Sequence, residues 1–335
     1  MNEVNDLFNK KISITLIILL IILSTAEFQY VSAQNEKTTV NTADTVSSEI
    51  TFDNSFFSSG GLSPEINPFW TPEETGFKAG MRYSILIGIP LIHLVYGFSN
   101  WNWGEEDDWM WAHERWFQAD TDSGGADKAG HFFAHYTVSR ISYSIFSYTE
   151  QSRSRALFYS AFTAALVGTM IEFGDAYTGE YGFSSEDLVA DYLGIAAAYL
   201  LDRYPVLDEF IGITEFYWPS EGFKDDKDKT FMNFAGDYSG AKWMVNFKLA
   251  GFEYIGFDIP EFMRYIQLDA GYYTRDYTEY DNRVNPQRYL FVGVSVNMRE
   301  VARDLFPGNR KAGWVAEQPF KYYHVPVDYE KPNEL

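Results

Sequence analysis

The chain has 335 residues, enough for one or two domains, and 46% of them are hydrophobic, as is usual for a chain that packs a core. Its net charge of −21 repels phosphate backbones and argues against nucleic-acid binding. The sequence contains no cysteine, which excludes disulfides, thiolate metal ligands, a cysteine nucleophile and a lipid-modified cysteine. Aromatic residues make up 18% of it. Tyr and Trp favour positions that are dry at one end and wet at the other, so this share favours contact with a membrane or the cell envelope.

The N-terminus has the pattern of a secretory signal peptide over residues 1–33. Lys10 and Lys11 precede an apolar run, Ile12 to Leu23, and small residues follow up to Ala33. The run is shorter than the roughly 20 residues that span a bilayer. We therefore predict cleavage after Ala33 and export to the periplasm or outer membrane of a bacterial envelope. An uncleaved anchor is the alternative.

The chain next divides into an irregular lead-in, residues 34–75, and a helical core domain, residues 76–205. Lys78 to Phe98 begins the core with a buried or membrane-lying helix that we expect to kink near Pro90. The segment 101–116 is rich in Trp and acidic residues. It is interpreted equally well as a loop at a lipid headgroup boundary or as a lid over the core.

Three further helices complete the predicted core, at about 126–148, 153–173 and 184–202. The second is rich in Ala and almost uncharged, which indicates burial on most sides. The third begins at Ser184 or Ser185, with Asp187 placed for an N-terminal cap.

A period of two replaces the helical pattern from about residue 231. Three alternating runs, around 242–249, 266–273 and 290–297, predict three to five half-buried antiparallel strands in a β region over 225–300, and the last two runs pair as a hairpin. A closed outer-membrane barrel needs about eight strands, so one chain cannot form it alone. Residues 301–335 form the tail, which is predicted to be irregular after Phe306.

Ionisable residues recur at helical spacing on the three core helices. Asp127, His131 and His135 are four residues apart, so they share one helix face, with Lys128 beside them. Further acids are Glu172 and Asp175 on the second helix, and Asp187 and Asp191 on the third. Burying such groups is costly unless they pair, so we expect them to meet.

Four interpretations of this cluster remain open. It is structural if Lys128 pairs with Glu172 or Asp191. It is catalytic if His131 transfers a proton while Glu172 or Asp175 orients it. It binds a divalent metal if His131, His135, Glu172 and Asp175 are ligands, although no HExxH motif is present and no cofactor is predicted outright. In the fourth, Lys128 recognises a headgroup, with Asp127, Asp187 and Asp191 as further binding residues.

Three motifs carry a family resemblance over about residues 101–203. They are Asp127-Lys128-Ala129-Gly130-His131, Glu172-Phe173-Gly174-Asp175, and the segment from Gly182 to Gly194. Together they resemble a bacterial family of predicted periplasmic lipoproteins of unknown function, whose pattern is similar to that of VanZ-like membrane proteins. The resemblance implies envelope residence and a small helical core with these polar positions inside. It implies no reaction, and the lack of cysteine departs from the lipoprotein pattern.

The sequence thus predicts an α+β protein with a compact core of three to five helices, partly membrane-like, followed by a small antiparallel β region. The leading function is membrane-associated binding or organisation of an envelope component. The alternative is a hydrolase or transferase acting on a lipid or glycan headgroup, with His131 as acid/base. A protein partner that adds to an edge strand is a third role.

Overall fold

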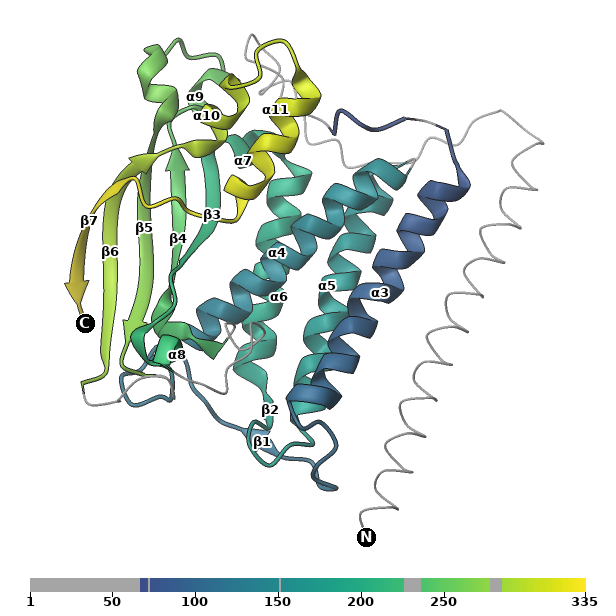
Figure 1. The fold of residues 1–335 in the computed structure, drawn as a ribbon, viewed down its shortest axis with the longest axis vertical. Helices are drawn as coiled ribbons and strands as arrows, with labels where there is room; N and C mark the ends of the chain where they lie inside the picture. The colour runs from purple at the N-terminus through teal and green to yellow at the C-terminus, as the bar shows by residue number, and fades with distance from the viewer. Residues whose placement is uncertain (1–66, 72, 151, 226–235, 278–284) are drawn as a thin grey trace.

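The computed structural model describes residues 67–71, 73–150, 152–225, 236–277 and 285–335. The predicted signal peptide and most of the lead-in therefore lie outside the described residues. Within them the protein is α+β, as predicted: a bundle of long helices stands beside one antiparallel sheet (Figure 1).

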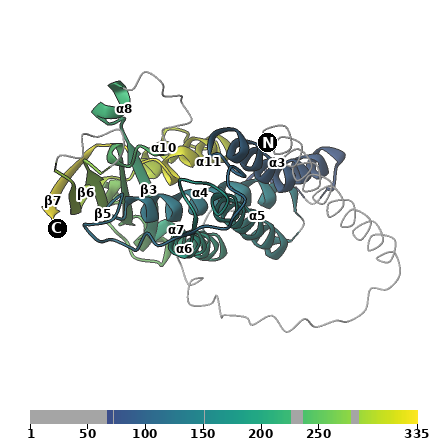
Figure 2. The same ribbon diagram turned by 90° about the horizontal axis from the view of Figure 1, so that it is seen from below.

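Four long helices form the core. They are α3 (Gly76–Asn100), α4 (Ala126–Thr149), α5 (Arg153–Asp175) and α6 (Ser185–Arg203). The last three lie within two residues of their predicted bounds. Figure 2 shows α4 between the sheet on one side and α5 and α3 on the other. Helix α4 therefore joins the two halves of the molecule.

Local sequence explains how these helices begin and how closely they pack. Ser184 caps α6, since its side chain accepts a hydrogen bond from the backbone N–H of Asp187. A Cβ at Gly194 would lie 2.1 Å from the carbonyl oxygen of Phe132, so the absence of a side chain lets α6 approach the backbone of α4. This close crossing brings the polar faces of the two helices together.

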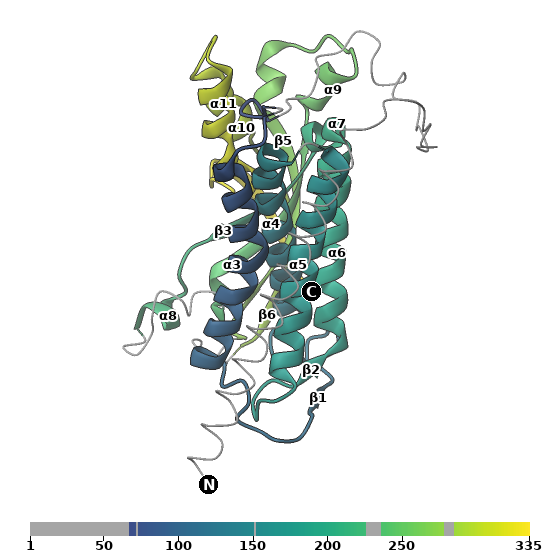
Figure 3. The ribbon, with the colours of Figure 1, turned by 90° about the vertical axis from the view of Figure 1, so that its right-hand side faces the viewer.

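Two core helices, α3 and α5, are long and apolar enough to cross a membrane. They differ in burial, because 17% of the apolar window of α3 and 44% of that of α5 are buried inside the protein. Figure 3 shows α3, α5 and α6 side by side in front of the sheet.

The sheet has five antiparallel strands in the order β3-β4-β5-β6-β7. Their bounds are Ile211–Tyr217, Ala241–Lys248, Ile266–Arg275, Gln287–Val296 and Asp328–Glu334. The three runs of period two are β4, β5 and β6, and β5 pairs with β6 as predicted. The sheet begins before residue 225, because β3 follows directly after the core.

The prediction of an irregular tail is wrong. Helix α10 (Met298–Asp304), helix α11 (Arg310–Glu317) and strand β7 all fall in or adjoin residues 301–335. The reason is that these elements are short and charged, so they carry little apolar periodicity. The remaining short elements are β1 (Trp111–Ala112), β2 (Phe183–Ser184), α7 (Pro205–Phe210), α8 (Glu221–Asp225), η2 (Tyr238–Gly240), α9 (Gly251–Tyr254), η3 (Glu261–Tyr265) and η4 (Gln318–Lys321).

The Trp-rich segment 101–116 folds under one end of the bundle. Trp103 is buried where Gly97 of α3 and Gly174 of α5 lack side chains, since a Cβ at either glycine would lie 2.2 Å from its ring. Strand β1 of this segment pairs with β2, just before α6. The segment thus fixes the ends of three core helices relative to one another.

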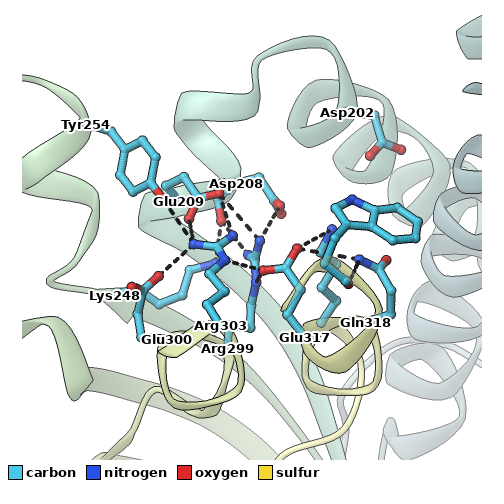
Figure 4. A network of polar contacts seen from close by, with 12 residues as sticks. Asp202, Asp208, Glu209, Lys248, Tyr254, Arg299, Glu300, Arg303, Glu317 and Gln318 are labelled. Carbon is cyan, nitrogen blue, oxygen red and sulfur yellow. Dashed lines mark hydrogen bonds and ion pairs between the residues drawn. The ribbon is translucent and has the colours of Figure 1, made fainter. Parts of the chain in front are cut away.

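A buried ionic network joins the C-terminal helices to the core (Figure 4). We call it the joint network: Asp208, Glu209, Lys248, Arg299, Glu300, Arg303 and Glu317. Arg303 donates to both carboxylate oxygens of Glu209 at 2.9 Å. Arg299 contacts Asp208 at 3.1 Å, and Glu317 accepts from Arg303. Paired charges therefore hold α10 and α11 on α7.

Candidate functional site

The predicted ionisable residues of α4, α5 and α6 do meet, around His131. Its Nδ1 donates to a carboxylate oxygen of Asp191 at 2.9 Å, and Glu172 lies 3.9 Å from the same nitrogen. Its other nitrogen, Nε2, lies 3.7 Å from Asp127 and 4.0 Å from Asp187. The imidazole thus stands between acids supplied by all three helices.

Lys128 forms a second centre in the same site. Its ammonium group contacts Asp127 at 2.6 Å, Asp187 at 2.7 Å and Glu114 from the loop before α4. Neither Glu172 nor Asp191 is its partner, so the expected pairing of Lys128 is wrong. Asp187, the N-terminal acid of α6, lies within reach of both Lys128 and His131 and so links the two centres.

His135 lies one turn beyond His131 and shares its acid. Nδ1 of His135 lies 2.6 Å from Asp191 and 3.1 Å from the carbonyl oxygen of His131. A Cβ at Gly168 of α5 would lie 2.6 Å from Asp191 and 2.9 Å from Nε2 of His135. A glycine is therefore required here for α5 to close over the pair.

Asp175 lies outside this constellation. Its carboxylate accepts a hydrogen bond from the indole N–H of Trp103 at 2.7 Å, and no ion pair within 4.0 Å joins it to His131 in the part of the chain that is described. Glu172 accepts the backbone N–H of Ser184 at 2.9 Å. Asp191, rather than Glu172 or Asp175, therefore orients His131.

We call the residues that meet here the core cluster: Glu114, Asp127, Lys128, His131, His135, Glu172, Asp187 and Asp191. Most of its side chains are buried. The most exposed are Glu114, at 33%, and His131, at 20%, followed by Asp127 at 17%. The cluster thus opens to the outside on the side where these three side chains lie.

The two acids that flank His131, Glu172 and Asp191, have pKa values that are shifted in opposite directions. Burial raises the pKa of Glu172 to about 9, because the lowering effect of His131 is smaller. Burial also opposes ionisation of Asp191, but hydrogen bonds from His131 and His135 outweigh it and lower the pKa of Asp191. Near pH 7 Glu172 is therefore protonated and Asp191 is ionised.

His131 itself carries a proton. Burial would lower its pKa, but the charges of Asp187, Asp127 and Asp191 and the hydrogen bond to Asp191 raise it well above its ordinary value. On the Lys128 side, burial and the neighbouring acids Asp127 and Asp187 raise the pKa of Glu114 to about 8. The site thus holds several protons at neutral pH that solvent-exposed residues of the same types would not hold.

Among the residues that the structure describes, two groups of three have ligand atoms within 4.8 Å of one another: His131, His135 and Asp191; and Asp127, His131 and Asp187. Neither group includes Glu172 or Asp175, which the sequence suggested as metal ligands. At the second group the ammonium of Lys128 already lies against Asp127 and Asp187. A divalent cation there would compete with a resident positive charge.

Sequence reasoning missed Glu114 and Tyr238. Tyr238 of η2 donates to Asp127 at 2.7 Å and comes from beyond α6, in the segment between β3 and β4. Neither lies on the helical faces where periodicity places the other residues. One signal was present for Glu114: a buried lysine beside a single aspartate needs further acids.

The comparisons with known proteins bear on this region alone. No curated protein and no solved structure matches the chain. The likeness to VanZ-like proteins stays a resemblance of motifs. One family model matches residues 113–203, and it includes every member of the core cluster. The family is described as periplasmic, which agrees with the predicted export. Residues 113–203 are thus the part of this chain that matches the model of the family described as predicted periplasmic lipoprotein (DUF2279), a family of unknown function.

Proposed function

We propose that this protein is a membrane-associated envelope protein that binds an envelope component at the open side of the core cluster. The observation that carries the proposal is an excess of acceptors. Five acids, Glu114, Asp127, Glu172, Asp187 and Asp191, surround one lysine and two histidines, and the lysine is already saturated by acids.

The chemistry of the ligand follows from this excess. The exposed edge offers carboxyl oxygens of Glu114 and Asp127 together with the Nε2–H of the protonated His131. Carboxyl oxygens accept hydrogen bonds in either protonation state, and Asp127, whose burial is outweighed by His131 and Lys128 so that its pKa is lowered, is ionised and also attracts positive charge. A ligand that brings N–H or O–H donors, such as a primary ammonium headgroup, therefore suits the opening better than a bare phosphate does.

The test compares two headgroups of equal charge. We would record the imidazole NMR signals of the full chain with vesicles of phosphatidylglycerol mixed with either phosphatidylethanolamine or phosphatidylcholine. The first headgroup donates N–H bonds and the second cannot. We expect the His131 signal, assigned through His131→Gln, to move only with phosphatidylethanolamine.

Two variants serve as controls. Glu114→Gln should weaken the response, because it removes an acceptor at the opening. Glu221→Gln, at a fully solvated acid of α8, should leave it unchanged. Equal responses to both headgroups, or none to either, would contradict the proposal.

A second candidate is a hydrolase or transferase acting on a headgroup. It is favoured by one observation: Asp191 holds Nδ1 of His131, and this imidazole carries a proton and is 20% exposed. An oriented imidazolium is suited to protonate a leaving group. Release of headgroup from the same vesicles, lost in His131→Gln, would support this candidate. No release by the unaltered protein would contradict it for these lipids.

A further inference from the structure

Part of the sheet is built with its polarity reversed. In an antiparallel sheet with one covered face, the covered face is normally apolar and the open face polar. Here Asn246 of β4 and Asp269 of β5 are buried and bonded to each other at 2.7 Å. Their neighbours along the same strands, Val245 and Leu268, are exposed.

The strand register places the exposed residues in rows across the sheet. Val245, Ala270 and Val292 lie opposite one another on β4, β5 and β6, and so do Phe247, Leu268 and Val294. We call these six residues and Leu290 the outer strip. Apart from Ala270, which is also exposed, their side chains are 39% to 62% exposed.

The outer strip continues a surface that the protein already uses for apolar packing. On β3 and β4, Ile213 and Trp243 of the same face are buried in the core that α4 and α6 share with the sheet. Beyond β4 the helices no longer cover it. The outer strip thus belongs to a sheet face that packs into the core at β3 and the start of β4. The rest of that face is not covered by any part of the described chain.

The composition of the strip distinguishes between occupants. Protein interfaces carry about one hydrogen bond per 100–200 Å² and are enriched in Tyr, Trp and Arg. The outer strip contains only hydrocarbon side chains, without a donor or acceptor. Such a surface matches the hydrocarbon of a lipid layer better than it matches a protein.

The residues at the border of the outer strip also suit a lipid layer. Lys331 and Asn333 of β7 end two of the rows, opposite Val292 and Leu290, while Tyr329 ends the third. An unpaired strand edge does not occur in hydrocarbon, but charged and aromatic residues suit the headgroup level. Exposed Phe262, just before β5, adds an aromatic residue at one end of the strip.

The core helices also carry exposed apolar side chains. They include Phe158 and Phe162 on α5, Leu193 and Leu200 on α6, and Ile92 and Val95 on α3. The exposed apolar surface is therefore far more than the single scattered residues that are normal on a soluble protein.

We propose that the outer strip of the sheet rests on the hydrocarbon of a lipid bilayer, with β7 at the headgroup level. The inference does not rest on the core cluster, because it concerns a different face and different residues. It assigns the β region a lipid-binding role that the helices alone were expected to have.

The absence of cysteine makes a direct test practical. A nitroxide label would be attached at Val292→Cys in the full chain, reconstituted in vesicles of phosphatidylethanolamine and phosphatidylglycerol. Matched labels would be placed at Val315→Cys on α11, a valine of similar exposure, and at Asn333→Cys on β7. Relaxation of each label by oxygen, which partitions into lipid, would be compared with relaxation by a water-soluble nickel chelate.

We expect the label at residue 292 to respond to oxygen and to lose its response to nickel on reconstitution. Labels at 315 and 333 should keep their response to nickel. Retained nickel access at 292 would overturn the proposal. So would loss of access to both reagents together with dipolar broadening between labels, since that result identifies a second copy of the chain as the occupant. Val294→Cys repeats the measurement if Val292→Cys does not fold, as judged by circular dichroism.

Discussion

Two of the buried ionic clusters in the described part of the chain differ in how their acids are paired. In the joint network, arginines neutralise the acids that they contact: Glu209 meets both terminal nitrogens of Arg303, and the pKa of Glu209 is lowered, since arginine charges outweigh its burial. In the core cluster, acids outnumber bases, and burial raises the pKa of Glu172 to about 9.

This difference distinguishes a network that stabilises the fold from a cluster that is suited to bind a ligand or transfer a proton. The joint network fixes three parts of the chain through close arginine–carboxylate pairs. The core cluster keeps Glu172 protonated near pH 7, keeps Asp191 ionised, and leaves His131 partly open. Neighbouring acids whose pKa values are pushed apart are typical of sites that bind or transfer protons. Four changes test this distinction.

The largest loss of stability is expected for Arg303→Met in the joint network. It leaves Glu209 and Glu317 buried without their main partner, and breaking a buried pair in this way costs about 3–5 kcal/mol. Denaturant unfolding would measure the loss. Arg115→Met, at an exposed pair with Asp120, is the control and should cost less than about 1 kcal/mol. Equal losses of unfolding free energy in the two variants would contradict the expected difference between buried and exposed ion pairs.

A smaller loss is expected for Gly194→Ala, which tests the helix crossing beneath the core cluster. The added Cβ would collide with the backbone of Phe132, so the free energy of unfolding should fall by about 1–3 kcal/mol. Gly88→Ala in α3 meets nothing within 4 Å and should instead stabilise the helix by about 0.5–1 kcal/mol. Thermal melts of both variants would measure this. We expect the melting temperature to fall for Gly194→Ala and to rise for Gly88→Ala.

His131→Gln should cost about 1 kcal/mol, because one hydrogen bond to Asp191 is lost where water can enter. The raised pKa of His131 fixes how this cost depends on pH. Stability that comes from its proton is fully present below its ordinary pKa of 6.5 and is lost as pH rises through the folded value. Unfolding measured over a pH series that rises from about pH 6 should therefore show a cost that fades as pH increases. A loss as large as that of Arg303→Met would make the core cluster structural.

The smallest change in stability is expected for Glu172→Gln at acidic pH. The folded protein holds a proton on Glu172 between its ordinary pKa of 4.5 and about 9, whereas the unfolded chain releases it. The native protein therefore loses stability as pH rises through this range, and the neutral glutamine removes that loss. Unfolding midpoints of the two proteins should agree near pH 4.5 and diverge, in favour of the variant, toward pH 9. Parallel pH curves would contradict the assignment of the proton to Glu172.

Local sequence determined the core helices and the identity of most site residues. Helix α6 begins directly after Ser184, whose side chain caps it, and the spacing of four places His131 and His135 on one face. It also determined strands β4, β5 and β6, since alternation depends only on neighbouring residues. The same alternation could not tell which face is covered, because an inverted sheet has the same period as an ordinary one.

Only the tertiary structure decided the partners. Asp191 rather than Glu172 holds His131, Glu114 enters from a loop and Tyr238 from η2, and the C-terminal helices α10 and α11 pack around the joint network. Which acid faces which base depends on how close α6 comes to α4, and Gly194 sets that distance through a contact distant in sequence. Periodicity says which residues share a face, whereas packing decides what that face meets.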